Sequence, residues 1–255
     1  MLSVTDAQLI SWINAFLLPL ARVLAMIAAA PVLNHQSIPM TVKVGLGACV
    51  AALIAPTLPP QSTQLLGGWN GILVIVAQIG IGVSFGFMLR LFFAGIEFAG
   101  DIIGMQMGLS FATILDPQAG AANPVTATFM GLIASLIFLS IDGHLTMIAA
   151  ISDSFRVFPI GMPTAVGGTL ARDLATMGGE VFRIAVHLSL PVVATLLICN
   201  LALGAMMRAA PQLNLMSIGF PISLLVGLWI MWICAPQLVG AIQGHLARGL
   251  GLLLR

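Results

Sequence analysis

The chain has 255 residues, of which 60% are hydrophobic and only 7% are charged, and its formal net charge is +1. Soluble domains typically carry about a quarter charged residues, so this composition indicates a membrane protein. The nearly balanced charge offers no electrostatic basis for binding nucleic acid or acidic substrates.

Six apolar stretches follow one another along the chain, at roughly 9–33, 44–56, 71–107, 124–151, 184–207 and 215–243. We expect the first to stay in the mature protein, because the segment before it has no positive charge and contains Asp6. A membrane-spanning helix needs about 20 apolar residues. The second stretch is too short by that rule and the third is too long for one simple span. We therefore expect an all-α membrane protein that departs from six regular spans.

Residues 80–108 predict a helix with one distinctive face. At 100° per residue, nearly all of its charge and most of its glycines fall on a single stripe. A charged residue at mid-bilayer costs about 2.5–3.5 kcal/mol, and glycines four residues apart let another backbone approach closely. The stripe should therefore contact protein rather than lipid, and contacts within the chain or with another subunit fit equally well. Its members are Gly82, Gly86, Arg90, Glu97, Gly100, Asp101, Gly104 and Gly108.

A break in helical structure is predicted at 109–123. Asp116 precedes Pro117, which disfavours a helical conformation there, and Pro124 suits the first turn of the next helix. Non-helical backbone at membrane depth is tolerated only where protein buries it or where it lines a wet cavity. The segment is half apolar, so we expect a loop held inside a protein-walled space. The alternative is a surface loop resting on lipid headgroups.

The two methionines before this break, Met105 and Met107, have flexible thioether side chains. They could form a soft, pore-facing contact surface, or they could simply fill space in a core.

The most polar segment is 152–183, which we interpret as a solvated connector that contains a possible short surface helix, "TLARDLATMGGEVFR". The three cysteines, Cys49, Cys199 and Cys234, all lie in apolar stretches and are expected to pack as small hydrophobic residues.

Groups that could support catalysis are few. Asp142, Gly143 and His144 form the most suggestive cluster, but the other histidines, His35, His187 and His245, are scattered along the chain. A metal site needs three or four ligands within reach, so no metal or cofactor is expected. An aspartate pair for intramembrane proteolysis, such as Asp101 with Asp142, lacks a recognisable motif. We expect no enzymatic activity.

Four segments in order resemble the FliR/SctT export-gate family of type III secretion, in its flagellar branch. The resemblance covers nearly the whole chain. The segments are "PLARVLAMIAAAPVLNHQSIPMTVKVGLG" (19–47), "EFAGDIIGMQMGLSFATILDP" (97–117), "DGHLTMIAAISDSFRVFPIG" (142–161) and "LALGAMMRAAPQLNLMSIGFPISLLVG" (201–227).

This resemblance implies a subunit without enzymatic activity that joins FliP and FliQ in a helical pore, with FlhB on the cytoplasmic side. Unfolded flagellar proteins would pass through the pore, in the bacterial inner membrane at the flagellar basal body. It also implies a single domain of kinked helical hairpins, with a FliP-like part at 1–183 and a FliQ-like hairpin with a C-terminal tail at 184–255. No nucleic-acid partner is expected.

The resemblance further implies that the loop after the glycine-bearing helix helps to close the pore. We call this loop the plug loop, with Phe111 as a plug contact and the Asp116–Pro117 side as a hinge. We assign the stripe, from Gly82 to Gly104, to subunit contacts. The plug loop comprises Gly108, Leu109, Ser110, Phe111, Ala112, Thr113, Ile114, Leu115, Asp116 and Pro117. A competing hypothesis is a secondary transporter for a small solute, since broken helices and midplane charges also suit that class.

Overall fold

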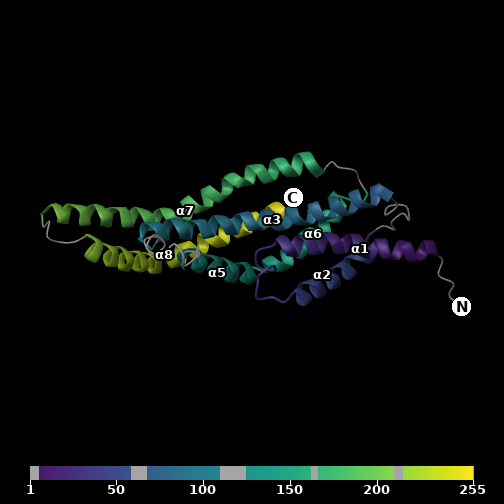
Figure 1. The fold of residues 1–255 in the computed structure, drawn as a ribbon, viewed down its shortest axis with the longest axis horizontal. Coiled ribbons are helices and arrows are strands. Elements are labelled where there is room, and N and C mark those ends of the chain that lie inside the picture. Colours follow the sequence, from purple (N-terminus) through teal and green to yellow (C-terminus); the bar gives the residue numbers. More distant parts are fainter. Residues whose placement is uncertain (1–5, 59–67, 110–124, 162–165, 210–214, 255) are drawn as a thin grey trace. The chain divides into compact units, whose positions relative to one another are not determined.

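A computed structural model describes residues 6–58, 68–109, 125–161, 166–209 and 215–254, and every regular element in these ranges is a helix. The expectation of an all-α fold is confirmed. Figure 1 shows the order of the elements along the chain. They are α1 (Asp6–Ala29), α2 (Met40–Ile54), the short 3-10 helix η1 (Ala55–Thr57), α3 (Gly68–Gln106), α5 (Val125–Ser140), α6 (Gly143–Val157), α7 (Val166–Ala209) and α8 (Leu215–Leu253).

Four of these helices are long and apolar enough to cross a membrane, and α5 with α6 adds a fifth if that broken pair counts as one span. The expectation that the second apolar stretch is too short is wrong. Its helix begins upstream of the stretch, at Met40, and continues through η1, so the candidate span Met40–Thr57 has 18 residues. The other candidate spans are Trp69–Gln106, Ala175–Met206 and Gly219–Leu253.

The polar segment 152–183 is also more helical than predicted. Its second part opens α7, which continues without interruption from Val166 to Ala209. The expected boundary between the FliP-like and FliQ-like parts, at 183/184, therefore falls inside one helix. That division stays a prediction.

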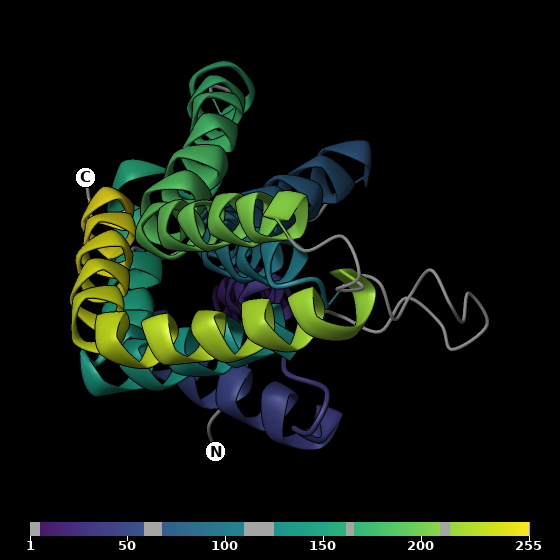
Figure 2. The same ribbon diagram turned by 90° about the vertical axis from the view of Figure 1, so that its left-hand side faces the viewer.

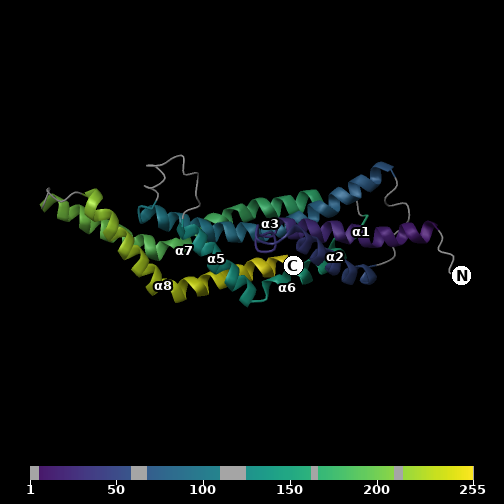
Figure 3. The same ribbon diagram turned by 60° about the horizontal axis from the view of Figure 1, so that its bottom comes forward.

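Prolines lie inside three of the helices: Pro19 in α1, Pro191 in α7, and Pro221 and Pro236 in α8. A proline in a helix interior removes one backbone hydrogen bond and its ring crowds the preceding turn, which kinks the helix. Figure 3 shows α8 bending part-way along its length. The expectation of kinked helices thus has a local cause in the sequence.

The chain divides into two compact units. Unit 1 comprises residues 1–91, 142–177 and 248–255, and unit 2 comprises 92–141 and 178–247. In unit 1, α1 packs along α2 and also contacts α6. Its core includes the side chains of Leu18, Met26, Leu89, Met147 and Ile151, all almost completely buried.

Unit 2 is built from the second part of α3 together with α5, α7 and α8. Phe93 of α3 meets Phe138 of α5 edge to face with ring centroids 5.9 Å apart, and Phe98 of α3 meets Phe182 of α7 at 5.7 Å. Figures 1 and 2 both show the end of α7 beside the start of α8, where the Ser223 hydroxyl donates a hydrogen bond to Asn200 Oδ1 at 3.1 Å. Helix α3 therefore lies against both α5 and α7.

Candidate functional site

In unit 1, the glycine stripe of α3 lies directly against α1. A Cβ at Gly82 would overlap the backbone carbonyl of Arg22, and a Cβ at Gly86 would lie 2.6 Å from the Met26 carbonyl oxygen and from Ala29 Cβ. No residue with a side chain fits these two positions without moving a helix backbone. The close approach predicted from the glycine spacing therefore occurs here within the chain.

In unit 2, the same stripe lies against α5. A Cβ at Gly100 would come within 2.6 Å of Ala127 Cα and the Thr126 carbonyl oxygen, and one at Gly104 would overlap the Thr126 hydroxyl. Glu97 lies one turn before Gly100 on α3. Its carboxylate lies over Gly131, where a Cβ would be 3.0 Å from Glu97 Oε1. Four stripe glycines therefore pack against helices of the same chain.

The charged members of the stripe are less enclosed. Arg90 and Glu97 are exposed and Asp101 is half-buried. The assignment of the stripe to subunit contacts stays a prediction, and these three side chains are the members with surface left for a partner.

Two polar atoms in unit 2, one on α3 and one on α5, are buried without a hydrogen-bond partner. They are Asp101 Oδ1 and Thr126 Oγ1, and Thr126 as a whole is only 5% exposed. Buried polar atoms in native proteins are nearly always paired, and a lone buried polar group costs about 1–3 kcal/mol. Within the described residues, Asp101 Oδ1 on α3 and Thr126 Oγ1 on α5 therefore each lack the hydrogen-bond partner that a buried polar atom favours.

The plug loop begins at a well-defined helix end. Gly108 has a left-handed φ of 85°, its N–H donates to the Met105 carbonyl at 3.1 Å, and the Leu109 N–H donates to the Gly104 carbonyl at 3.0 Å. This pair of bonds is the Schellman arrangement, in which glycine ends a helix without steric cost. The other plug-loop residues, Ser110 to Pro117, lie outside the described residues, so their role stays a prediction.

The two methionines before the loop have different surroundings. Met105 is 54% exposed, whereas Met107 is completely buried. A Cβ at Gly227 of α8 would lie 2.6 Å from both Cγ and Cε of Met107. The pore-facing role stays a prediction for both residues, but the Met107 side chain packs inside unit 2 and would have to leave that position to reach a pore.

Arg22 is a residue that sequence reasoning missed. It is fully buried, and its guanidinium donates to Gln78 Oε1 at 2.8 Å, Ser154 Oγ at 2.9 Å and the Phe158 carbonyl oxygen at 2.8 Å. Its Cζ also lies 3.9 Å from the Phe155 ring centroid. One side chain thus joins α1, α3 and α6 in unit 1. A single arginine within an otherwise apolar stretch was the available signal.

The expectation that the histidines lie apart from one another is wrong for one pair. The structure brings His187 of α7 and His245 of α8 together, although 58 positions separate them in the sequence. Helix packing, which no local pattern encodes, is the reason. Across the described residues, no three His, Cys, Asp or Glu side chains gather in a way that could hold a metal ion.

Asp142 also has a structural role. It is left-handed with a φ of 54°, and its carbonyl oxygen accepts hydrogen bonds from the N–H groups of Leu145 and Thr146 at 3.0 and 3.1 Å. These bonds close the first turn of α6, so the carbonyl group at this position serves the turn between α5 and α6.

These observations define a class: an all-α membrane protein in which one long helix carries a polar, glycine-rich face against its neighbours and ends at a glycine-capped break. Within that class, the chain belongs to the bacterial export proteins, family 1, whose family model matches residues 13–249. The resemblance found from the four sequence segments is therefore confirmed.

Relatives in several bacteria carry the name flagellar biosynthetic protein FliR. This chain is 41% identical to the one from Pectobacterium carotovorum subsp. carotovorum over 236 residues, which is 92% of this chain and 90% of that one. It is 42% identical to the Escherichia coli (strain K12) protein over 237 residues, with the same shares. The Bacillus subtilis (strain 168) protein is 29% identical over 230 residues, or 89% and 88%.

Proposed function

We propose that this chain is a core subunit of the flagellar type III protein export gate. In this role it forms, with FliP and FliQ, the pore through which unfolded flagellar proteins are exported, and it helps to close that pore. The observation that carries the proposal is the 41–42% identity to flagellar FliR proteins over 92% of the chain. At a coarser level, family membership makes the chain a bacterial export protein of the flagellar system.

The exposed side chains of the candidate spans support a subunit that lipid and neighbouring polypeptide cover. Many large apolar side chains are exposed, among them Trp69, Trp229 and Trp232 at 61–82%. Lipid or partner helices can cover such side chains, but water cannot do so without a large free-energy cost. Arg90, Glu97 and Asp101 are exposed or half-buried in candidate spans, where contact with lipid would be costly, so polypeptide or water is the favourable neighbour.

We further propose a location for the subunit and a division of the chain into two parts. The subunit lies in the bacterial inner membrane at the flagellar basal body, and FlhB contacts its cytoplasmic side. Residues 1–183 correspond to a FliP-like part, and 184–255 to a FliQ-like hairpin with a tail. The plug loop, from Gly108 to Pro117, contributes to closure.

Co-expression tests the partner requirement. The chain should be recovered in stable form only together with FliP- and FliQ-like partners, as a complex whose native mass contains all three. A stable monomer that transports a small solute in liposomes would instead support the secondary-transporter hypothesis and end the gate proposal.

Deletion of residues 110–115 tests closure. Cells with the deletion should assemble the complex normally but leak small ions, because the pore would lose its seal. Unchanged ion conductance with normal assembly would exclude a sealing role for the plug loop, while leaving the subunit's place in the gate intact.

A further inference from the structure

Unit 1 carries a groove whose walls belong to α1, α2 and α3. Figure 1 shows α1 and α2 side by side. The groove has a volume of about 370 Å³, which lies within the range of about 300–1,000 Å³ that is typical of small-molecule sites. One turn after Lys43, α1 and α2 touch directly, since a Cβ at Gly47 would overlap the Leu24 side chain. The groove is therefore held open by helix packing.

The lining of this groove is apolar except at one place. Its polar side chains are those of Asn34 and Lys43, and every other lining residue is Ala, Val, Leu, Ile or Met. None of the described residues that line it is acidic. Met40 and Ile79 line it and are 71% and 43% exposed, so the groove opens to the surface of unit 1. One cation thus lies beside an open apolar surface.

The Lys43 ammonium is held in position by its neighbours. It donates a hydrogen bond to Asn34 Oδ1 at 2.9 Å, and Asn34 Nδ2 donates to the Ala28 carbonyl oxygen at 2.6 Å. An ammonium group has three N–H donors. Asn34 therefore orients Lys43 while leaving donors for a further acceptor.

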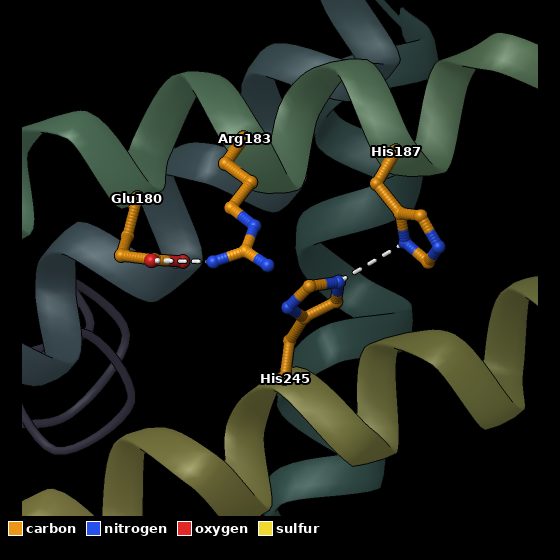
Figure 4. A network of polar contacts seen from close by, with 4 residues as sticks. All are labelled: Glu180, Arg183, His187 and His245. Atoms are coloured by element: carbon orange, nitrogen blue, oxygen red, sulfur yellow. Dashed lines mark hydrogen bonds and ion pairs between the residues drawn. The ribbon is translucent and has the colours of Figure 1, made fainter.

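The charge of Lys43 is not neutralised by a carboxylate of the described residues. Other cations of the chain do have such a partner. Arg183 pairs with Glu180 at 3.2 Å, as Figure 4 shows. Arg156 pairs with Asp153 at 4.0 Å. Lys43 keeps its positive charge available for an anion from outside the chain.

The position of Lys43 in its helix corresponds to the depth of lipid headgroups. The candidate span Met40–Thr57 has 18 residues, and at 1.5 Å per residue it is about 27 Å long, close to the hydrocarbon thickness of about 30 Å. Lys43 is the only charged residue of this span and lies in the first turn of α2. Lysines near helix ends extend their ammonium groups to the membrane interface, where the lipid phosphates lie.

We propose that this groove binds one anionic phospholipid, whose phosphate contacts Lys43 and whose acyl chain lies along the apolar wall that includes Leu24 and Val44. Basic pockets between membrane helices bind anionic headgroups, because the charge attraction adds to burial of the hydrocarbon. A carboxylate from a neighbouring subunit would satisfy the charge of Lys43 but would leave the apolar groove unfilled. A molecule that carries both an anion and a hydrocarbon chain matches both parts of the site.

Lipid titration of the complex tests the site. The full chain, purified with its partners and delipidated in detergent, is titrated with dioleoyl phosphatidylglycerol or dioleoyl phosphatidylcholine, and bound lipids are counted by native mass spectrometry. We expect one phosphatidylglycerol per copy of this chain to bind about fivefold more tightly than phosphatidylcholine, since one lysine near an anionic lipid contributes about that factor. Equal affinities for the two lipids would overturn the proposal.

Variants separate the charge from the groove. Lys43→Met should abolish the preference for phosphatidylglycerol, whereas Lys43→Arg should keep it. Ala28→Phe should weaken binding of both lipids, because its ring would fill the groove. Arg208→Met is the matched control, since Arg208 is an exposed cation in the last turn of α7 and does not line the groove. An unchanged preference in Lys43→Met would contradict the proposal.

A readout on the wild type remains decisive if a variant assembles poorly. Lys43 is the only lysine of the chain, so its acetylation by acetic anhydride can be followed by mass spectrometry of a single peptide. Phosphatidylglycerol should slow this reaction more than phosphatidylcholine or glycerol phosphate does at the same concentration. Equal protection by glycerol phosphate would show that a free anion suffices and would overturn the lipid site. If Lys43 were unreactive in the delipidated complex, neighbouring polypeptide would cover the groove, and the proposal would be wrong.

Discussion

The Met107 side chain at the end of α3 lies against Gly227 of α8, where a Cβ would come within 2.6 Å of its Cγ and Cε atoms. Met107 is completely buried, and the residue after it, Gly108, ends the helix. The point where the chain leaves α3 for the plug loop is therefore held by a contact with α8. This contact links the start of the predicted plug loop to the predicted FliQ-like hairpin.

A double-mutant cycle measures this contact. Alone, Gly227→Ala should destabilise the protein, because overpacking costs about 1–3 kcal/mol while alanine gains at most about 1 kcal/mol in helix propensity. In a Met107→Ala background, the overlap disappears and Gly227→Ala should become stabilising. Thermal unfolding of the detergent-solubilised complex, co-expressed with FliP- and FliQ-like partners, provides the readout. Gly240→Ala on the same helix has open space around it and should be stabilising in both backgrounds. A change in melting temperature of the same sign for Gly227→Ala in both backgrounds would contradict the coupling.

Gly100→Ala should weaken the contact between α3 and α5. The new Cβ would lie 2.6 Å from backbone atoms of Thr126 and Ala127, which cannot rotate away, so we expect a loss of about 1–3 kcal/mol. Gly80→Ala is the control on the same helix, since nothing lies within 4 Å of a Cβ there. Melting temperature and yield of assembled complex should fall for the first variant only, and equal behaviour of the two would argue against a tight helix contact.

Gly104→Leu tests the same contact with a larger side chain. It should reduce assembly more than Gly100→Ala does, because the side chain would overlap Thr126 and force the helices apart. Complex yield after co-expression measures the effect. A normal yield would show that this face is not a tight interface.

Arg22→Met should destabilise unit 1. It would remove the donor to the buried Gln78 Oε1, and leaving such an acceptor unpaired costs about 1–3 kcal/mol; Ser154 would also lose this donor but would keep its hydrogen bond to the Ile151 carbonyl oxygen. Arg22→Lys keeps the charge but cannot make the three bonds of the guanidinium fork, so it should also destabilise. Arg156→Met is the control, because its ion pair with Asp153 is long, at 4.0 Å, and exposed. Equal melting temperatures for the Arg22 and Arg156 variants would contradict the structural role.

Gly108→Ala should shift the end of α3. A residue with a Cβ in the left-handed region costs about 1–2 kcal/mol, and asparagine tolerates that region better. We expect lower stability and slower spreading in soft agar for the alanine variant, with Gly108→Asn between it and the wild type. If Gly108→Ala matched the wild type in both assays, the glycine cap would not control where the loop begins.

The sequence by itself determined the fold class, the family and the positions of most helices. Low charge and long apolar stretches require a membrane-embedded helical protein, because backbone groups in lipid must be satisfied within the segment. Glycine spacing on α3 predicted that another backbone approaches this face, because that property depends only on helical periodicity and side-chain size.

Only the tertiary structure decided which elements meet. The glycine stripe contacts α1 in unit 1 and α5 in unit 2, Met107 packs against Gly227, Arg22 joins three helices, and His187 lies beside His245. Each of these contacts joins residues distant in the sequence. The periodicity of a single helix reports which residues share a face but carries no information about the neighbour that covers it, because that choice depends on the packing of all the helices together.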